Sequence, residues 1–211
     1  MIHEMTLHIT KSGQCPGLVR RYGAETLPLR RSLADGGRFV GAWTGEFGPL
    51  NSFYELWEFA DVAAQQAAQA QRLADARWHA HVRELAPLLE SVETVCLKPF
   101  RSIAQRADAG RMYDFRIYTI KPFHADEYAG HFAGIMPVRE KYSKNFCVWT
   151  PLTGNVHRVF HLWPYESPDR RLAVRGAMGA DPAWQEFIAK VFPLIVAQTS
   201  SLLRPVPDLI E

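Results

Sequence analysis

The chain has 211 residues, of which 47% are hydrophobic and 22% are charged, which is typical of a folded globular protein and excludes a disordered chain. Its 24 basic and 22 acidic residues leave a net charge of +2 without a basic run, so we expect no nucleic-acid partner. No apolar stretch reaches the roughly 18 residues of a membrane span, and the first residues lack the pattern of a secretory signal. We therefore expect a cytoplasmic protein with no membrane partner.

The spacing of apolar residues predicts the elements of the first half. Residues Glu4 to Thr10 alternate polar and apolar side chains, which is the period of a strand. Val82 and Leu85 follow Trp78 at helical spacing. In chain order we predict a strand at Glu4 to Thr10, a helix at about Pro16 to Leu33, two strands at Arg38 to Thr44 and Ser52 to Phe59 about Gly48-Pro49, a helix around Trp78 that ends at Pro87, and a strand leading to Leu97-Lys98-Pro99.

The same order of elements recurs in the second half, after a charged stretch near Arg101 to Arg111 that we predict to be a linker. Asp181 precedes Pro182, which indicates a capping carboxylate before the first helical position. The predicted elements are a strand at Asp114 to Ile120, a helix at about His124 to Tyr142, strands at Asn145 to Thr150 and His157 to Trp163 about Gly154-Asn155, a helix that begins at Asp181-Pro182 and ends at Pro193, and a strand leading to Leu203-Arg204-Pro205.

The six tryptophans indicate that the halves are copies of one unit. They form three pairs at a constant separation of 106 residues: Trp43 with Trp149, Trp57 with Trp163, and Trp78 with Trp184. Nearer the amino ends the separation is 110 for Lys11 and Lys121 and 109 for Pro28 and Pro137, which indicates small deletions around the first helix of the second copy. We therefore predict two βαββαβ domains, residues 1–103 and residues 110–211.

Several of these segments also occur in a known family. They are Tyr113 to Pro122, Val159 to Tyr165 and Asp181 to Gln185 with Pro193-Leu194 in the second copy, and Gly41-Ala42-Trp43-Thr44, Gly48-Pro49-Leu50-Asn51 and Leu56-Trp57-Glu58 in the first. Together they resemble NIPSNAP domains over nearly the whole chain. The resemblance implies an α+β fold of two tandem ferredoxin-like units, each with an antiparallel sheet in the order 4-1-3-2 and both helices on one face.

The same resemblance implies how the two sheets meet. In single-domain relatives two such sheets pack through their free faces as a dimeric α/β-barrel. A tandem chain is expected to build this barrel within itself, as an internal pseudodimer, and a further homo-oligomer is left open.

Strand parity selects the candidate site residues of the second copy. The apolar set expected beneath the helices is Phe115, Ile117, Phe160 and Leu162. The set of opposite parity, expected on the barrel-facing side, is Arg116, Tyr118, His161 and Trp163, with Trp149 assigned to it by its alternation with Phe146 and Val148. A cation, a phenol, an imidazole and indoles in one enclosed space suit a small oxygenated or acidic molecule and proton transfer. Arg116, Tyr118 and His161 are the catalytic candidates, and Trp149 and Trp163 are binding candidates.

The equivalent face of the first copy carries different side chains, namely Thr6, His8, Glu55 and Trp57. Here His8 and Glu55 could form an acid/base pair, and His8, Glu55 and Trp57 are binding candidates. Since the copies differ, we predict that the second holds the better-formed polar pocket. The alternative for every candidate is structural, because polar residues in such interfaces often satisfy one another and tryptophans often pack.

Other motifs exclude several chemistries. Cys15, Cys96 and Cys147 form no CxxC pair, which favours buried thiols over a metal or redox site. No P-loop, HExxH or GxSxG motif occurs in a fitting context, so we expect neither a metal nor a dissociable cofactor. The sequence therefore favours a protein that binds or transforms a small oxygenated organic molecule in a barrel pocket, and leaves open whether it is an enzyme.

Two alternatives remain open. The first is a non-catalytic scaffold, since animal NIPSNAP proteins are mitochondrial and are discussed in trafficking and organelle quality control. The second is a haem-binding or monooxygenase-like protein, by analogy with other barrels of this fold. A polar pocket favours the small-molecule hypothesis, whereas a filled interior with an exposed apolar patch favours the scaffold.

Overall fold

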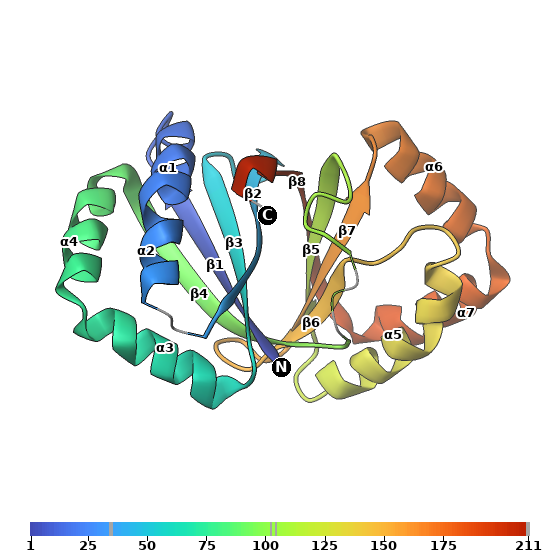
Figure 1. Cartoon of the computed structure of the whole chain (residues 1–211). Helices are drawn as coiled ribbons and strands as arrows, with labels where there is room; N and C mark the ends of the chain where they lie inside the picture. Colours follow the sequence, from blue (N-terminus) through green and yellow to red (C-terminus); the bar gives the residue numbers. More distant parts are fainter. Residues whose placement is uncertain (34–35, 102, 104, 210–211) are drawn as a thin grey trace.

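The eight strands of the computed structural model, which describes residues 1–33, 36–101, 103 and 105–209, form one closed antiparallel barrel. Their order around the barrel is β1-β3-β2-β8-β5-β7-β6-β4. Figure 1 shows the strands in the middle, the first-half helices on one flank and the second-half helices on the other. The predicted barrel of two sheets within one chain is therefore confirmed.

Each half contributes four neighbouring strands in the predicted order 4-1-3-2. The first half supplies β1 (Ile2–Thr10), β2 (Arg38–Phe47), β3 (Ser52–Phe59) and β4 (Leu89–Pro99). The second half supplies β5 (Met112–Ile120), β6 (Cys147–Pro151), β7 (Arg158–Tyr165) and β8 (Ile195–Pro205). The barrel closes where β2 pairs with β8 and β4 pairs with β6. Two residues of the predicted linker, 102 and 104, lie outside the described part of the chain.

The helices cover the outer face of each sheet. In the first half they are α1 (Cys15–Arg21), a π-helical turn (Tyr22–Thr26), α2 (Leu27–Ser32), α3 (Val62–Ala74) and α4 (Ala76–Leu85). In the second half they are α5 (Ala125–Arg139), α6 (Pro168–Gly179) and α7 (Pro182–Val191). Short 3₁₀ turns follow at Ala86–Leu88, Phe192–Leu194 and Pro207–Leu209. Among the described residues, no helix is long and apolar enough to cross a membrane.

The second helical region of each half differs from the prediction, because it contains two helices instead of one. Asp75 and Asp181 separate them, each with an extended backbone and a side chain that accepts hydrogen bonds from the amides at the start of the next helix. Pro182 adds to the break, since a residue before proline avoids the helical conformation. Periodicity around Trp78 and Trp184 indicated only the later helix of each pair.

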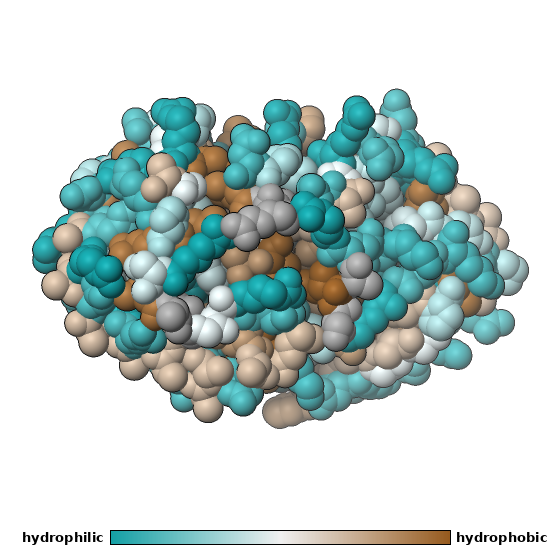
Figure 2. Space-filling model, viewed as in Figure 1, coloured by the Kyte–Doolittle hydropathy of each residue, from teal (hydrophilic) through white to brown (hydrophobic). Residues whose placement is uncertain are grey.

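Side chains from both halves fill the barrel. Its interior is lined by aromatic and aliphatic residues, including Trp43, Tyr54, Phe115, Trp149 and Phe160. Rings meet across the seam: the centres of Tyr54 and Phe115 lie 5.5 Å apart at an interplanar angle of 67°. Figure 2 shows hydrophobic residues gathered near the middle of the molecule, between the helices of the two halves. The barrel is thus a packed core that joins the halves.

The structure reverses the predicted assignment of the strand faces. Phe115, Phe160 and Leu162 lie inside the barrel, whereas Tyr118 and Trp163 pack beneath the helices. Parity grouped these residues correctly, but it does not say which group faces outward. Both faces of these strands are buried, so polarity did not decide the direction. The expectation that Arg116, Tyr118, His161 and Trp163 face the barrel is therefore wrong.

Candidate functional site

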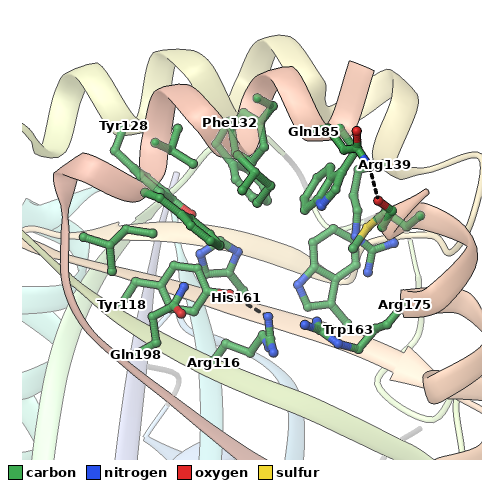
Figure 3. Close-up of a pocket in the computed structure, with 18 of the residues that line it drawn as sticks. Arg116, Tyr118, Tyr128, Phe132, Arg139, His161, Trp163, Arg175, Gln185 and Gln198 are labelled. Carbon is green, nitrogen blue, oxygen red and sulfur yellow. Dashed lines mark hydrogen bonds between the residues drawn. The ribbon is translucent and has the colours of Figure 1, made fainter. Parts of the chain in front are cut away.

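A cavity of about 460 Å³ lies between the second-half sheet and helices α5, α6 and α7. Arg116, Tyr118, His161 and Trp163 all line it. The register explains why they meet: β5 and β7 are neighbours, and Arg116 lies directly opposite His161. Figure 3 shows these residues on the strand side of the cavity and Tyr128 and Phe132 on the helix side. The four candidates of equal parity thus share one cavity.

A short chain of hydrogen bonds holds Arg116 in place. Its Nε lies 3.2 Å from a carboxylate oxygen of Asp114, and its Nη1 donates to the hydroxyl of Tyr118 at 2.5 Å. Asp114 is bound more closely by Arg171, at 2.7 Å, and by Ser200, at 2.6 Å. Burial alone would raise the pKa of Asp114, but the charge of Arg116 and these hydrogen bonds lower it. The carboxylate is therefore ionised and already shared between two guanidinium groups.

His161 is the opposite case, a buried polar side chain without a partner. It is 2% exposed, and no described residue forms a hydrogen bond with either ring nitrogen. Its ring packs against those of Tyr118 and Phe132, each with a centre-to-centre distance of 4.7 Å. Burial, followed by the charges of Arg116 and Arg139, lowers the pKa of His161 well below its usual value. A neutral imidazole therefore lies beside cations.

Two further arginines line the cavity. Arg139, the last residue of α5, places its guanidinium 3.8 Å from the centre of the Trp163 ring and donates to the hydroxyls of Tyr165 and Ser143. Arg175, on α6, makes no hydrogen bond or ion pair within the described part of the chain. Burial lowers the pKa of both guanidinium groups. An anion in the cavity would relieve this cost, because an opposite charge stabilises a buried cation.

The rest of the wall is apolar and aromatic. It includes Tyr128 and Phe132 from α5 and Trp184, Phe187 and Ile188 from α7. Burial raises the pKa of Tyr128 well above its usual range, so this phenol stays protonated. The three lining arginines and the single lining carboxylate, Asp114, leave an excess of positive charge. Such a cavity suits an organic anion with an apolar body.

The donor set does not form a metal site. The part of the chain that the structure describes contains no group of three His, Cys, Asp or Glu residues able to hold a metal ion. The imidazole of His161 lines the cavity; its Nε2 is buried, and its ring packs against Tyr118, Tyr128 and Phe132.

In the first half, a hydrogen-bonded network surrounds the equivalent residues. Glu55 accepts hydrogen bonds from Nε2 of His8 at 2.9 Å, from Nε1 of Trp57 at 2.7 Å, and from the hydroxyl of Tyr22. The guanidinium of Arg30 lies 3.5 Å from the same carboxylate. Burial alone would raise the pKa of Glu55, but the hydrogen bond and charge of His8, together with Arg30 and Tyr22, lower it to about 2. The predicted contact between His8 and Glu55 is present, inside a structural network.

Two predicted residues do not join these groups. Trp149 lies opposite Phe160 and faces the barrel interior, while its neighbour Val148 lies opposite His161. Its Nε1 donates to Nδ1 of His3 in the other half at 2.8 Å. Trp149 faces the barrel as predicted, but the expectation that it shares the pocket with Arg116 is wrong, because the strand register places Val148, not Trp149, opposite His161. The hydroxyl of Thr6 pairs with that of Thr94 at 3.0 Å, on the next strand.

A sequence profile of the NIPSNAP family matches residues 7–103 and, a second time, residues 113–209. The chain belongs to the NIPSNAP family. It is 25% identical to the protein NipSnap homolog of Dictyostelium discoideum over 178 residues, 81% of this chain and 76% of that protein. Its identity to the mouse protein NipSnap homolog 3B is 37% over 93 residues, 44% of this chain and 37% of that protein. The chain therefore matches little more than a third of the length of this mouse NIPSNAP protein.

Solved structures share the barrel as a whole. This NIPSNAP chain is similar to a provisionally assigned monooxygenase from Fusobacterium nucleatum, with a TM-score of 0.68 and 12% identity over 97% of this chain and 91% of that one. At this identity the likeness shows the fold alone, and folds of this kind carry unrelated functions. The function of this NIPSNAP protein has to be argued from its own side chains.

Sequence reasoning missed Asp114, Arg139 and Arg175 as pocket residues. Asp114 was placed at the start of its strand without a role. Both arginines lie on helices, and the sequence pattern did not predict which face of each helix contacts the sheet. One signal was available for Arg139. The 109-residue separation that pairs Pro28 with Pro137 also pairs Arg30 with Arg139, and both stack on the tryptophan of the third strand of their half.

Proposed function

We propose that the second half of this NIPSNAP protein binds a small organic anion with an apolar body, in the cavity beneath α5, α6 and α7. The observation that carries this proposal is the charge imbalance of the cavity. Its lining contains three arginines, Arg116, Arg139 and Arg175, but only one carboxylate, that of Asp114. Arg171 and Arg116 already neutralise that carboxylate. Buried cations without counter-ions are costly, so a ligand anion is the partner that this site lacks.

The apolar wall specifies the rest of the ligand. Phe132, Trp184 and Phe187 present rings and ring edges, which favour an aromatic or unsaturated body. A cavity of about 460 Å³ accommodates a molecule of drug size or smaller. The proposed ligand class is therefore aromatic and other largely apolar carboxylates, enolates and phenolates.

Matched pairs of ligands test this proposal. Isothermal titration compares benzoate with benzamide and 1-naphthoate with 1-naphthamide, which differ in charge but hardly in shape. We expect the acids to bind and the amides to bind at least about tenfold more weakly, since a hydrogen bond to a charged group contributes about 1.5–3 kcal/mol. Equal binding of acids and amides, or no binding of either, would contradict the proposal.

Variants locate the binding. Arg175→Gln should weaken acid binding by about tenfold or more. The matched control is Arg170→Gln, which removes the same charge from an exposed position on the same helix and should leave affinity unchanged. Equal losses in both variants would indicate long-range attraction instead of binding in the cavity.

A second candidate function is an enzyme that moves a proton, and the observation that favours it is His161. This imidazole is neutral, without a hydrogen-bond partner among the described residues, and next to cations that would stabilise an enolate or phenolate. In such a step a proton leaves a carbon or oxygen of the ligand for the ring nitrogen, and the electron pair stays on the ligand. Exchange of ligand hydrogens in D₂O, followed by proton NMR, tests this step, and His161→Gln should abolish catalysed exchange.

A further inference from the structure

The two halves build the same stacked pair around equivalent tryptophans. The guanidinium of Arg30 lies 3.6 Å from the centre of the Trp57 ring, and that of Arg139 lies 3.8 Å from the centre of the Trp163 ring. An acidic residue of the first strand lies opposite each tryptophan, Glu4 in one half and Asp114 in the other. The two sites are therefore comparable residue by residue.

In the first half, the protein supplies the carboxylate that this pair requires. Glu55 lies two residues before Trp57 on β3 and accepts a hydrogen bond from the indole Nε1. It also lies within ion-pair distance of Arg30, whose other Nη atom is 3.4 Å from Glu4. Glu4 in turn pairs with Arg72 at 3.4 Å. Among the described residues, two carboxylates thus lie within ion-pair distance of two guanidinium groups.

In the second half, the residue at the position of Glu55 is His161. Among the described residues, no carboxylate lies within ion-pair distance of Arg139, and nothing accepts a hydrogen bond from Nε1 of Trp163. The shorter Asp114 is held by Arg116, Arg171 and Ser200. The same stacked pair is therefore present without its carboxylate, and it borders the cavity.

We infer that the carboxylate of the ligand occupies, in the second half, the place that the Glu55 carboxylate occupies in the first. It accepts hydrogen bonds from Arg139 and from Nε1 of Trp163, and the apolar body extends toward Phe132 and Phe187. This inference rests on the proposed function and adds to it a defined subsite. Carboxylates suit it, because the guanidinium and the indole N–H donate from two stacked planes, and the two carboxylate oxygens can accept one hydrogen bond from each.

The test restores the internal carboxylate by His161→Glu, with His161→Gln as the neutral control of similar length. In His161→Glu we expect a melting temperature about 3 °C or more above that of His161→Gln, because the new carboxylate meets Arg139 and Trp163 as Glu55 meets Arg30 and Trp57. Adding Arg139→Met to His161→Glu should remove this gain. A His161→Glu protein no more stable than His161→Gln would overturn the inference.

Ligand binding gives a second readout. With 1-naphthoate as probe, His161→Glu should bind at least about tenfold more weakly than His161→Gln, since its own carboxylate fills the subsite. Failure of the wild-type protein to bind any acid would contradict the proposed function and, with it, the inference. Acid binding that depends on Arg175 but is unchanged in Arg139→Met and in His161→Glu would overturn the inference and leave the proposed function standing.

Discussion

Replacing Glu55 with glutamine removes one charge and hardly changes shape, so it measures the first-half network directly. Glu55 accepts hydrogen bonds from three side chains and lies 3.5 Å from Arg30. Breaking a buried ion pair by removing one partner costs about 3–5 kcal/mol. The pKa of Glu55 gives a similar figure, because its fall from 4.5 to about 2 corresponds to about 3 kcal/mol of stability at neutral pH. We therefore expect Glu55→Gln to lose about 3 kcal/mol.

Urea unfolding at pH 7, followed by tryptophan fluorescence, measures this loss. The matched control is Glu58→Gln, the same change on the same strand at a half-buried position, where the carboxylate pairs with His3 and with the exposed Arg38 and which should cost less than Glu55→Gln. The losses from Glu55→Gln and Arg30→Met should not add in the double variant, because each change removes one side of the same contact. If Glu55→Gln costs no more than Glu58→Gln, the network does not stabilise the first half as we describe.

Because the pKa of Glu55 is lower in the folded than in the unfolded chain, the wild-type protein should lose stability as pH falls from 4.5 toward about 2, and Glu55→Gln should lose less in urea titrations over this range. Because burial and the charges of Arg116 and Arg139 lower the pKa of His161, its imidazole NMR signals should not shift between about pH 8 and pH 6, and titration near the usual value would contradict its burial among cations. Tyr54→Ala and Phe115→Ala should each cost about 3–5 kcal/mol, with a coupling of about 1 kcal/mol in the double variant, whereas strict additivity would indicate that the two rings do not meet across the seam.

The fold could be predicted from the sequence because the chain contains a repeat, so that each element predicted in one half could be compared with the equivalent element in the other. The paired tryptophans aligned every strand, and the elements at Ser52 to Phe59 and Asp114 to Ile120 match the observed strands closely. The direction of the faces could not be predicted in this way. Phe115 and Arg116 alternate correctly, but the barrel buries one face and the helices bury the other, so neither face is marked by exposure to water.

The site was predicted in part. Arg116, Tyr118 and His161 were grouped from strand parity, and the structure brings them to one cavity. Arg139 and Arg175 come from helices, and their approach to the strands depends on how α5 and α6 pack on the sheet. The sequence showed one difference between the halves, the replacement of Glu55 by His161 at the equivalent position. Its consequence could not be predicted, because it depends on the stacking of Arg30 and Arg139 on their tryptophans, which only the structure shows.

We propose that the second half receives from a ligand the carboxylate that the first half supplies itself. The most direct measurement is a crystal structure with 4-iodobenzoate, in which anomalous scattering locates the iodine. We predict an iodine peak in the cavity beneath α5 and α7, with the carboxylate beside Arg139 and Nε1 of Trp163, and none beside Glu55. A peak beside Glu55, or a cavity that stays empty while the ligand binds only on the surface, would contradict the account.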